Sequence, residues 1–118
     1  MKIAAAIHDL MFSSKVNAAA AAAGGQTVAW LPRGQAVAPW VAEQKPDVLL
    51  IDLGNAKLDA VAAIAAVKGA PETKSVVVIG YIGHEQAETI AAAKAAGADQ
   101  VMSKGEFARR LPELLGAR

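Results

Sequence analysis

Four apolar runs in the chain lead to polar residues that could take part in chemistry. Asp52 closes the apolar run 48–51, and a turn follows it. The other three runs lead to further polar side chains: His8, Asp9, His84 and Lys104. Carboxylates and imidazoles are common metal ligands, and a lysine beside them adds a compensating charge. These residue types predict a ligand or metal site, provided that the fold brings the four ends together.

Strand-like and helix-like segments alternate along the chain, and this alternation would bring the four ends together. Five short runs are typical of strands: 3–7, 27–30, 48–51, 76–81 and 100–102. Five strand–helix units in sequence predict an α/β fold with a parallel sheet and helices on both faces, because the crossover connections are right-handed. The carboxyl ends of parallel strands share one edge of the sheet. We therefore expect the aspartates, Lys104 and the histidines in one shallow crevice at that edge.

The helix-like segments carry apolar residues at helical spacing, and prolines interrupt two of them. Pro39 lies within the segment 34–44, so we expect a short helix there with Pro39 in its first turn. Pro112 predicts a break or kink between Phe107 and Leu114. The third helix is expected to pack through one face, formed by Leu58, Val61, Ile64, Ala65 and Lys68.

Length and composition exclude several classes of protein. With 118 residues, the chain is long enough for one domain and too short for two, so we expect a single domain over 1–118 and no output domain. The net charge of +1 gives no electrostatic footprint for nucleic acid, and no segment is apolar over the length of a membrane span. The absence of cysteine excludes disulfides and thiolate metal sites and agrees with a cytoplasmic location.

The residues at the strand ends resemble the receiver domain of bacterial two-component response regulators, and the resemblance covers nearly the whole chain. Asp9 matches the second acid after the first strand, Asp52 the phospho-accepting aspartate and Lys104 the lysine after the last strand. Residues 97–99 match the Gly-Ala-Asp of the family, and Gly54 matches the position whose carbonyl contacts the metal. The resemblance implies a flavodoxin-like (βα)5 three-layer sandwich with a five-stranded parallel sheet in the order 2-1-3-4-5.

The chain departs from the family pattern at four positions. His8 occupies the place of the first acid, and Ile82 occupies the place of the threonine or serine that ends strand four. Gly105 and Ala56 replace prolines. In the family, the hydroxyl at the position of Ile82 bonds the phosphoryl group and carries the change to the fourth and fifth helices. Isoleucine has no donor, so the resemblance implies a degenerate switch position.

The resemblance also implies a weak Mg²⁺ site held by Asp9, Asp52 and the carbonyl of Gly54. His8 removes one negative charge from this acidic pocket, and its nitrogen is a poor ligand for Mg²⁺. We expect Lys104, the phosphate-sensing lysine, to reach the Asp52 carboxylate directly or through one water, because a cation lowers the cost of holding two carboxylates together. A simple ion pair between the two residues, without further function, is the alternative interpretation.

Two functions of different classes are consistent with the sequence. The first is a free-standing receiver or pseudo-receiver, which is no enzyme but a signalling module that binds a histidine kinase or a downstream signalling protein. Its phospho-acceptor site at Asp52 is degenerate, so phosphorylation there is doubtful, and we expect a monomer or weak homodimer. The expected partner surface comprises the fourth helix, with its small residues Ala91, Ala92 and Ala95, the fifth strand and the fifth helix.

The second function is a metal- or small-molecule-binding α/β domain. Histidines beside carboxylates suit a transition ion better than Mg²⁺. The ligands of such a site would be His8, Asp9, Asp52 and His84.

Overall fold

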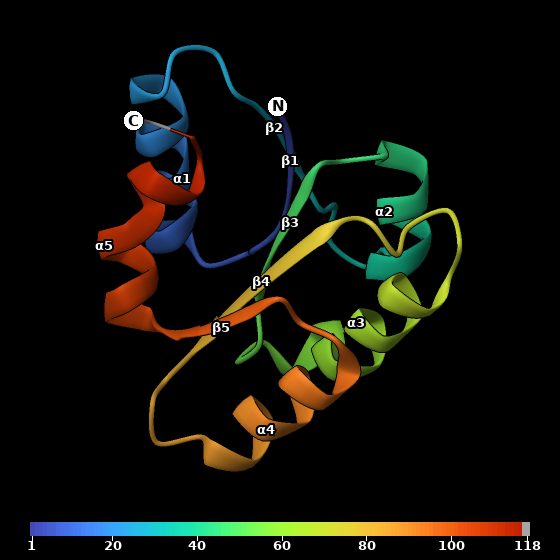
Figure 1. Cartoon of the computed structure of the whole chain (residues 1–118). Coiled ribbons are helices and arrows are strands. Elements are labelled where there is room, and N and C mark those ends of the chain that lie inside the picture. The colour runs from blue at the N-terminus through green and yellow to red at the C-terminus, as the bar shows by residue number, and fades with distance from the viewer. Residues whose placement is uncertain (117–118) are drawn as a thin grey trace.

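The five strands form one parallel sheet in the order β2-β1-β3-β4-β5 (Figure 1). The computed structural model describes residues 1–116. Every neighbouring pair of strands is parallel, so the fold class and the strand order expected from the sequence are confirmed. The strands are β1 (Lys2–Ala6), β2 (Thr27–Trp30), β3 (Val48–Asp52), β4 (Val77–Ile82) and β5 (Gln100–Ser103).

Helices cover both faces of the sheet and complete a three-layer sandwich. Figure 1 shows α1 and α5 side by side on one face and α2, α3 and α4 on the other. Among residues 1–116, no helix is long and apolar enough to cross a membrane. The helices are α1 (Leu10–Ala22), α2 (Val37–Gln44), α3 (Ala60–Gly69), α4 (Ala87–Ala96) and α5 (Lys104–Leu114), with a short 3-10 helix, η1 (Ala56–Leu58), before α3.

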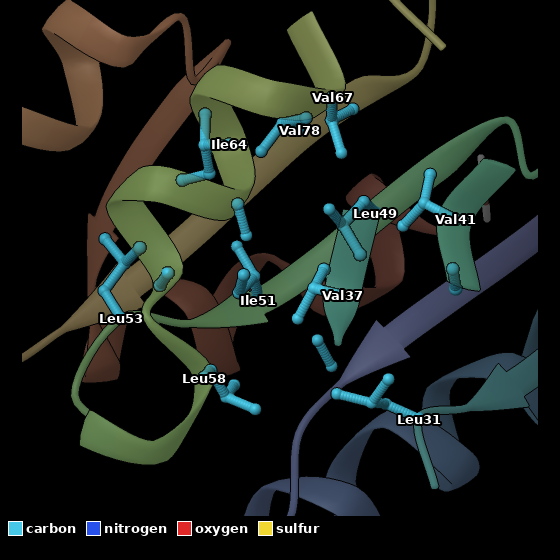
Figure 2. Packing of buried hydrophobic residues seen from close by; sticks show 14 of the residues in the cluster. Leu31, Val37, Val41, Leu49, Ile51, Leu53, Leu58, Ile64, Val67 and Val78 are labelled. Atoms are coloured by element: carbon cyan, nitrogen blue, oxygen red, sulfur yellow. The ribbon is translucent and has the colours of Figure 1, made fainter. Parts of the chain in front are cut away.

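Side chains of the central strands alternate between two hydrophobic cores, as the pleat of a strand requires. Along β3, Leu49 and Ile51 pack on the side of α2, α3 and α4, whereas Val48 and Leu50 pack on the side of α1 and α5. Figure 2 shows the first of these cores, in which strand residues meet side chains of α2 and α3. Because β3 is buried on both faces, its sequence is a continuous apolar run rather than an alternating one.

Of the predictions for the two proline-containing helices, the one for α2 is confirmed and the one for α5 is not. In α2, Pro39 is the third helical residue, in the first turn as predicted. The break predicted at Pro112 is wrong, because α5 runs without interruption from Lys104 to Leu114. Pro112 lies in the last turn of α5, where a missing N–H affects little of the helix. The backbone N–H of Leu115 still donates to the carbonyl of Leu111, at 3.0 Å.

The buried face of α3 differs from the predicted one. Leu58 belongs to η1, and Asp59, with a left-handed φ of 47°, separates it from α3. Ala65 is exposed, while Ile64 and Val67 point into the core. Ile64 was part of the predicted face, whereas Val67 takes the place of Ala65, and burying the larger side chain removes more apolar area from water.

Candidate functional site

The carboxyl ends of four strands lie level at one edge of the sheet. Asp52 ends β3 and pairs with Tyr81 of β4, and Ile82 pairs with Ser103 at the end of β5. The residue before Asp52 pairs with the last residue of β1. The register therefore places the segments that follow β1, β3 and β5 around Asp52, and they carry what we call the Asp52 site: Asp9, Asp52, Gly54 and Lys104.

Asp52 is a partly buried carboxylate held in place by the turn that follows it. Its Oδ1 accepts the backbone N–H of Gly54 at 2.9 Å. A side chain at position 54 would crowd this oxygen, since a Cβ there would lie 3.3 Å from Oδ1. Glycine therefore allows the turn to close directly over the carboxylate.

The surroundings of Asp52 raise the pKa of its carboxyl group above the usual value. Burial is the largest cause, and the charge of Asp9 acts in the same direction, while the Gly54 N–H and the charge of Lys104 oppose it. The Gly54 N–H and Lys104 offset only part of the upward shift. An additional cation near Asp52 would therefore stabilise its charged form. The strand register places the segments that carry Asp9, Asp52 and Lys104 at the same edge of the sheet, and these charge effects agree with that placement.

Asp9 has a structural role as well as a charge. Its Oδ1 accepts the backbone N–H groups of Met11 and Phe12, at 2.8 and 3.2 Å. These bonds cap the amino terminus of α1, where backbone donors lack partners within the helix. The cap fixes the Asp9 carboxylate beside Asp52.

Lys104 is the first residue of α5, and its side chain is exposed. Its charge lowers the pKa of Asp52, but the described ion pairs of residues 1–116 do not include a direct contact between the two. Of the two arrangements expected from the sequence, the direct contact is therefore not formed, and the contact through one water stays a prediction. An exposed lysine gains little from such a contact, because water solvates it almost as well.

His8 lies at the margin of the Asp52 site: its charge also lowers the pKa of Asp52, but its ring is bonded elsewhere. Its Nε2 lies 3.0 Å from the backbone carbonyl oxygen of Leu31, and because a carbonyl only accepts, Nε2 carries the proton. The ring also lines a hollow of about 650 Å³ between the β1 end, α2 and α3, together with Arg33, Lys57 and Asp59. His8 is thus half-buried and bonded rather than solvated.

The four-residue metal site of the second hypothesis is not assembled. The His84 side chain is 89 % exposed, and its closest charged neighbour is Glu85, at 3.9 Å. Residues 1–116 contain no group of three or more histidine, cysteine or acidic side chains arranged to hold a metal ion. The remaining donors are two carboxylates and the Gly54 carbonyl. This all-oxygen set fits Mg²⁺, which keeps several of its waters, better than it fits a transition ion.

Tyr81 is a further residue of this region, which the sequence analysis did not single out. It is fully buried, and its ring stacks on Phe12 of α1 and Phe107 of α5, with ring centroids 4.7 and 4.4 Å apart. Its hydroxyl has no hydrogen-bond partner. The spacing could have indicated this arrangement, because each phenylalanine follows a site residue, Asp9 or Lys104, by one helical turn.

Comparison with known proteins gives matches among solved structures. No family model matches the chain, and no curated protein matches it. A putative response regulator from Chloroflexus aurantiacus has a TM-score of 0.78 at 20 % identity, with 99 % of this chain and 98 % of that one covered. The Mn²⁺-bound form of the response regulator Rcp1 has a TM-score of 0.78 at 16 % identity, covering 96 % and 90 % of the two chains.

The chain has the receiver fold. A third receiver structure, from the Pseudomonas aeruginosa sensor histidine kinase PA1611, has a magnesium ion in its active-site cleft and matches with a TM-score of 0.76. It is 18 % identical, and the match covers 98 % of this chain and 97 % of that one. Two of these three structures therefore contain a bound divalent metal ion.

At the end of β4, the Ile82 side chain offers only carbon. It is 5 % exposed and belongs to the core beneath α3 and α4. Its Cγ1 lies 3.8 Å from where a Cβ on Gly54 would be, so it borders the turn that holds Asp52. The side chain next to the carboxylate at this position is thus apolar and cannot donate a hydrogen bond.

Proposed function

We propose that the chain is a receiver-like signalling domain that acts by binding another protein and has a degenerate phospho-acceptor site at Asp52. The observation that carries this proposal is the placement of Asp9, Asp52 and Lys104 around one strand end of a receiver fold. The domain would act in the cytoplasm as a monomer or weak homodimer, as a binding module rather than an enzyme.

The chemistry available at the Asp52 site is phosphoryl transfer to a carboxylate. An oxygen of Asp52 would attack the phosphorus of a donor, and the bond to the leaving oxygen would break with its electron pair. Asp9, Asp52 and the Gly54 carbonyl would hold Mg²⁺, which when bound supplies positive charge for the phosphoryl oxygens. The Lys104 ammonium, whose charge already lowers the pKa of Asp52, would add a second positive charge.

Two features support a degenerate site. His8 provides no carboxylate and is bonded to the carbonyl of Leu31, so the metal ligands are reduced to two carboxylates. Ile82 cannot bond a phosphoryl group from the switch position. We infer that phosphorylation is inefficient and that little change of shape follows it at α4.

Exposed apolar residues beside the site support a protein partner, such as a histidine kinase or a downstream signalling protein. Leu10 and Met11, directly after Asp9, are 81 % and 59 % exposed. On α4, Ala91, Ala92 and Ala95 are also exposed, as the predicted partner surface requires. Large exposed apolar side chains beside a functional site are typical of contacts with other proteins.

The test is incubation with acetyl phosphate and Mg²⁺, followed by intact-mass measurement. We expect a small fraction of singly phosphorylated protein, and none in Asp52→Asn, which keeps the acceptor for the Gly54 N–H but lacks the nucleophile. Complete phosphorylation of the parent would contradict the degenerate site. Phosphorylation that persists in Asp52→Asn would contradict the assignment of Asp52.

A further inference from the structure

Three of the five aromatic residues of the chain form a cluster directly beside the Asp52 site. This aromatic cluster consists of Phe12, Tyr81 and Phe107, and Tyr81 stacks on both phenylalanines at interplanar angles of 25° and 16°. Phe12 lies in the first turn of α1 and Phe107 in the first turn of α5. The helix ends that carry Asp9 and Lys104 therefore meet on the ring of Tyr81.

The hydroxyl of Tyr81 is the one buried side-chain polar atom without a hydrogen-bond partner in residues 1–116. Leaving a buried hydroxyl unpaired costs free energy, which packing alone would avoid by using phenylalanine. A tyrosine at a position that is fully buried thus points to a partner that is bound only in part of the functional cycle.

The surroundings of the hydroxyl place that partner at Asp52. Tyr81 and Asp52 are paired across β4 and β3, and alternation along the two strands directs both side chains to the α1 and α5 face. Burial raises the pKa of Tyr81, and the charges of Asp52 and Asp9 raise it further. A phenol is protonated at neutral pH, so this hydroxyl can donate a hydrogen bond.

We propose that the Tyr81 hydroxyl donates a hydrogen bond to the phosphoryl group, or to a mimic of it, when that group is bound at Asp52. Tyr81 would then supply from the α1 and α5 side the contact that Ile82 cannot make. This inference rests on the proposed function, because it requires a phosphoryl-type ligand at Asp52. A buried water is the competing partner for the hydroxyl, and it would leave ligand affinity independent of Tyr81.

The single tyrosine of the chain allows a direct measurement. Protein labelled with ¹³C at the tyrosine Cζ gives one resonance, whose shift reports hydrogen bonding of the adjacent hydroxyl. Beryllofluoride with Mg²⁺ is the probe for the phosphoryl group, and ¹⁹F NMR follows its binding. We expect the Cζ resonance to move with the same midpoint as ¹⁹F binding, and to remain still in Asp52→Asn.

Variants then measure what the hydroxyl contributes. Tyr81→Phe keeps the ring and removes one hydrogen bond to an anion, so we expect beryllofluoride to bind about tenfold more weakly. Thr73→Val is the matched control, because Thr73 is also a buried hydroxyl but bonds the carbonyl of Val67 at 2.7 Å, at the opposite end of the sheet. Its affinity should equal that of the parent.

The outcomes separate the two proposals. If the parent does not bind beryllofluoride, the phospho-acceptor assignment fails, and this inference fails with it. If the parent binds it through Asp52 while the Cζ resonance does not move, or Tyr81→Phe binds as tightly as the parent, only the role of Tyr81 is wrong. The Cζ measurement uses the parent protein and decides the question even if Tyr81→Phe does not fold.

Discussion

The fold disfavours the charged form of the Asp52 side chain. Burial, followed by the charge of Asp9, raises the pKa of this carboxyl group from the ordinary value of 3.8. The folded state therefore binds the proton more tightly than the unfolded chain does. The stability that this proton provides is fully present below the ordinary pKa and is lost as the pH rises through the raised one.

Asp52→Asn should therefore stabilise the protein near neutral pH. The amide keeps the shape of the side chain and the acceptor for the Gly54 N–H while removing the charge. Because Asp52 is only partly buried, we expect a gain of about 0.5 kcal/mol, or roughly 2–4 °C in Tm, at about pH 7. The gain should disappear at about pH 3, where the parent is also protonated.

Thermal unfolding in the presence of a chelator measures this effect. Glu72→Gln serves as the control, since Glu72 is an exposed carboxylate on the α3–β4 connection, at the other edge of the sheet. An Asp52→Asn variant that melts at or below the parent temperature at neutral pH would show that the charge of Asp52 is not unfavourable in the fold.

His8 limits the affinity of the site for Mg²⁺ in the proposed function. His8→Asp adds a carboxylate, and we expect Mg²⁺ binding, in the millimolar range in the parent, to tighten about tenfold. In the control His8→Asn, the asparagine has the size of the aspartate without its charge, so this variant should bind Mg²⁺ like the parent. Titration followed by amide NMR compares the three proteins, and equal affinities of His8→Asp and His8→Asn would contradict the role given to His8.

At the scale of elements, the start of α1 combines two tasks in one side chain. Asp9 caps the helix with two hydrogen bonds and contributes a carboxylate to the Asp52 site. Asp9→Ser keeps a good cap, so its unfolding free energy should change little while Mg²⁺ affinity falls several-fold. Asp9→Ala loses both, with an unfolding free energy lower by about 1 kcal/mol.

Chemical denaturation and a Mg²⁺ titration on the same two variants separate the tasks. Equal stability of Asp9→Ser and Asp9→Ala would mean that the cap contributes nothing. Unchanged Mg²⁺ affinity in Asp9→Ser would remove Asp9 from the metal ligands.

At the scale of the whole molecule, beryllofluoride should perturb the protein unevenly. Tyr81 connects the Asp52 site to the first turns of α1 and α5. Ile82 has no group that could hydrogen-bond beryllofluoride and so transmit its binding to α4. A ligand shifts a conformational equilibrium only through contacts that differ between the states. We expect amide shifts around Phe12 and Phe107 and none along 87–96.

A map of amide shifts in the bound and free protein tests this expectation. Large shifts that spread through α4 would show a working switch despite Ile82. Ile82→Thr is the informative comparison, because it places a hydroxyl at the position where the sequence lacks one.

The sequence was sufficient for the fold because the relevant signals are local. A parallel sheet follows from the apolar strand runs, the glycines after helices and the alternation of elements. Which residues meet at its edge follows from the positions at which the strands end. The face of α3 was not predictable, because the left-handed Asp59 changes where the helix begins. The end of α5 was not predictable either, since the effect of Pro112 depends on where the helix stops.

Predictions for the site were incomplete where tertiary contacts decide. His8 is bonded to a carbonyl from another strand end, and no pattern in the sequence gives that contact. The Lys104 ammonium makes no direct ion pair with Asp52, since solvation of an exposed lysine competes with such a pair. The unpaired hydroxyl of Tyr81 follows from the packing of α1 and α5, two helices at opposite ends of the chain.

The aromatic cluster determines how the spacing of α1 and α5 responds to ionic strength. The three rings, with Phe12 and Phe107 centroids 6.0 Å apart, join the helix ends that carry Asp9 and Lys104. Ring stacking is not screened by salt, whereas a site held together by an ion pair would loosen as salt is added. We expect the ring resonances of the cluster to be the same in dilute buffer and in molar salt. A marked shift would mean that charge, and not the rings, sets the spacing of α1 and α5.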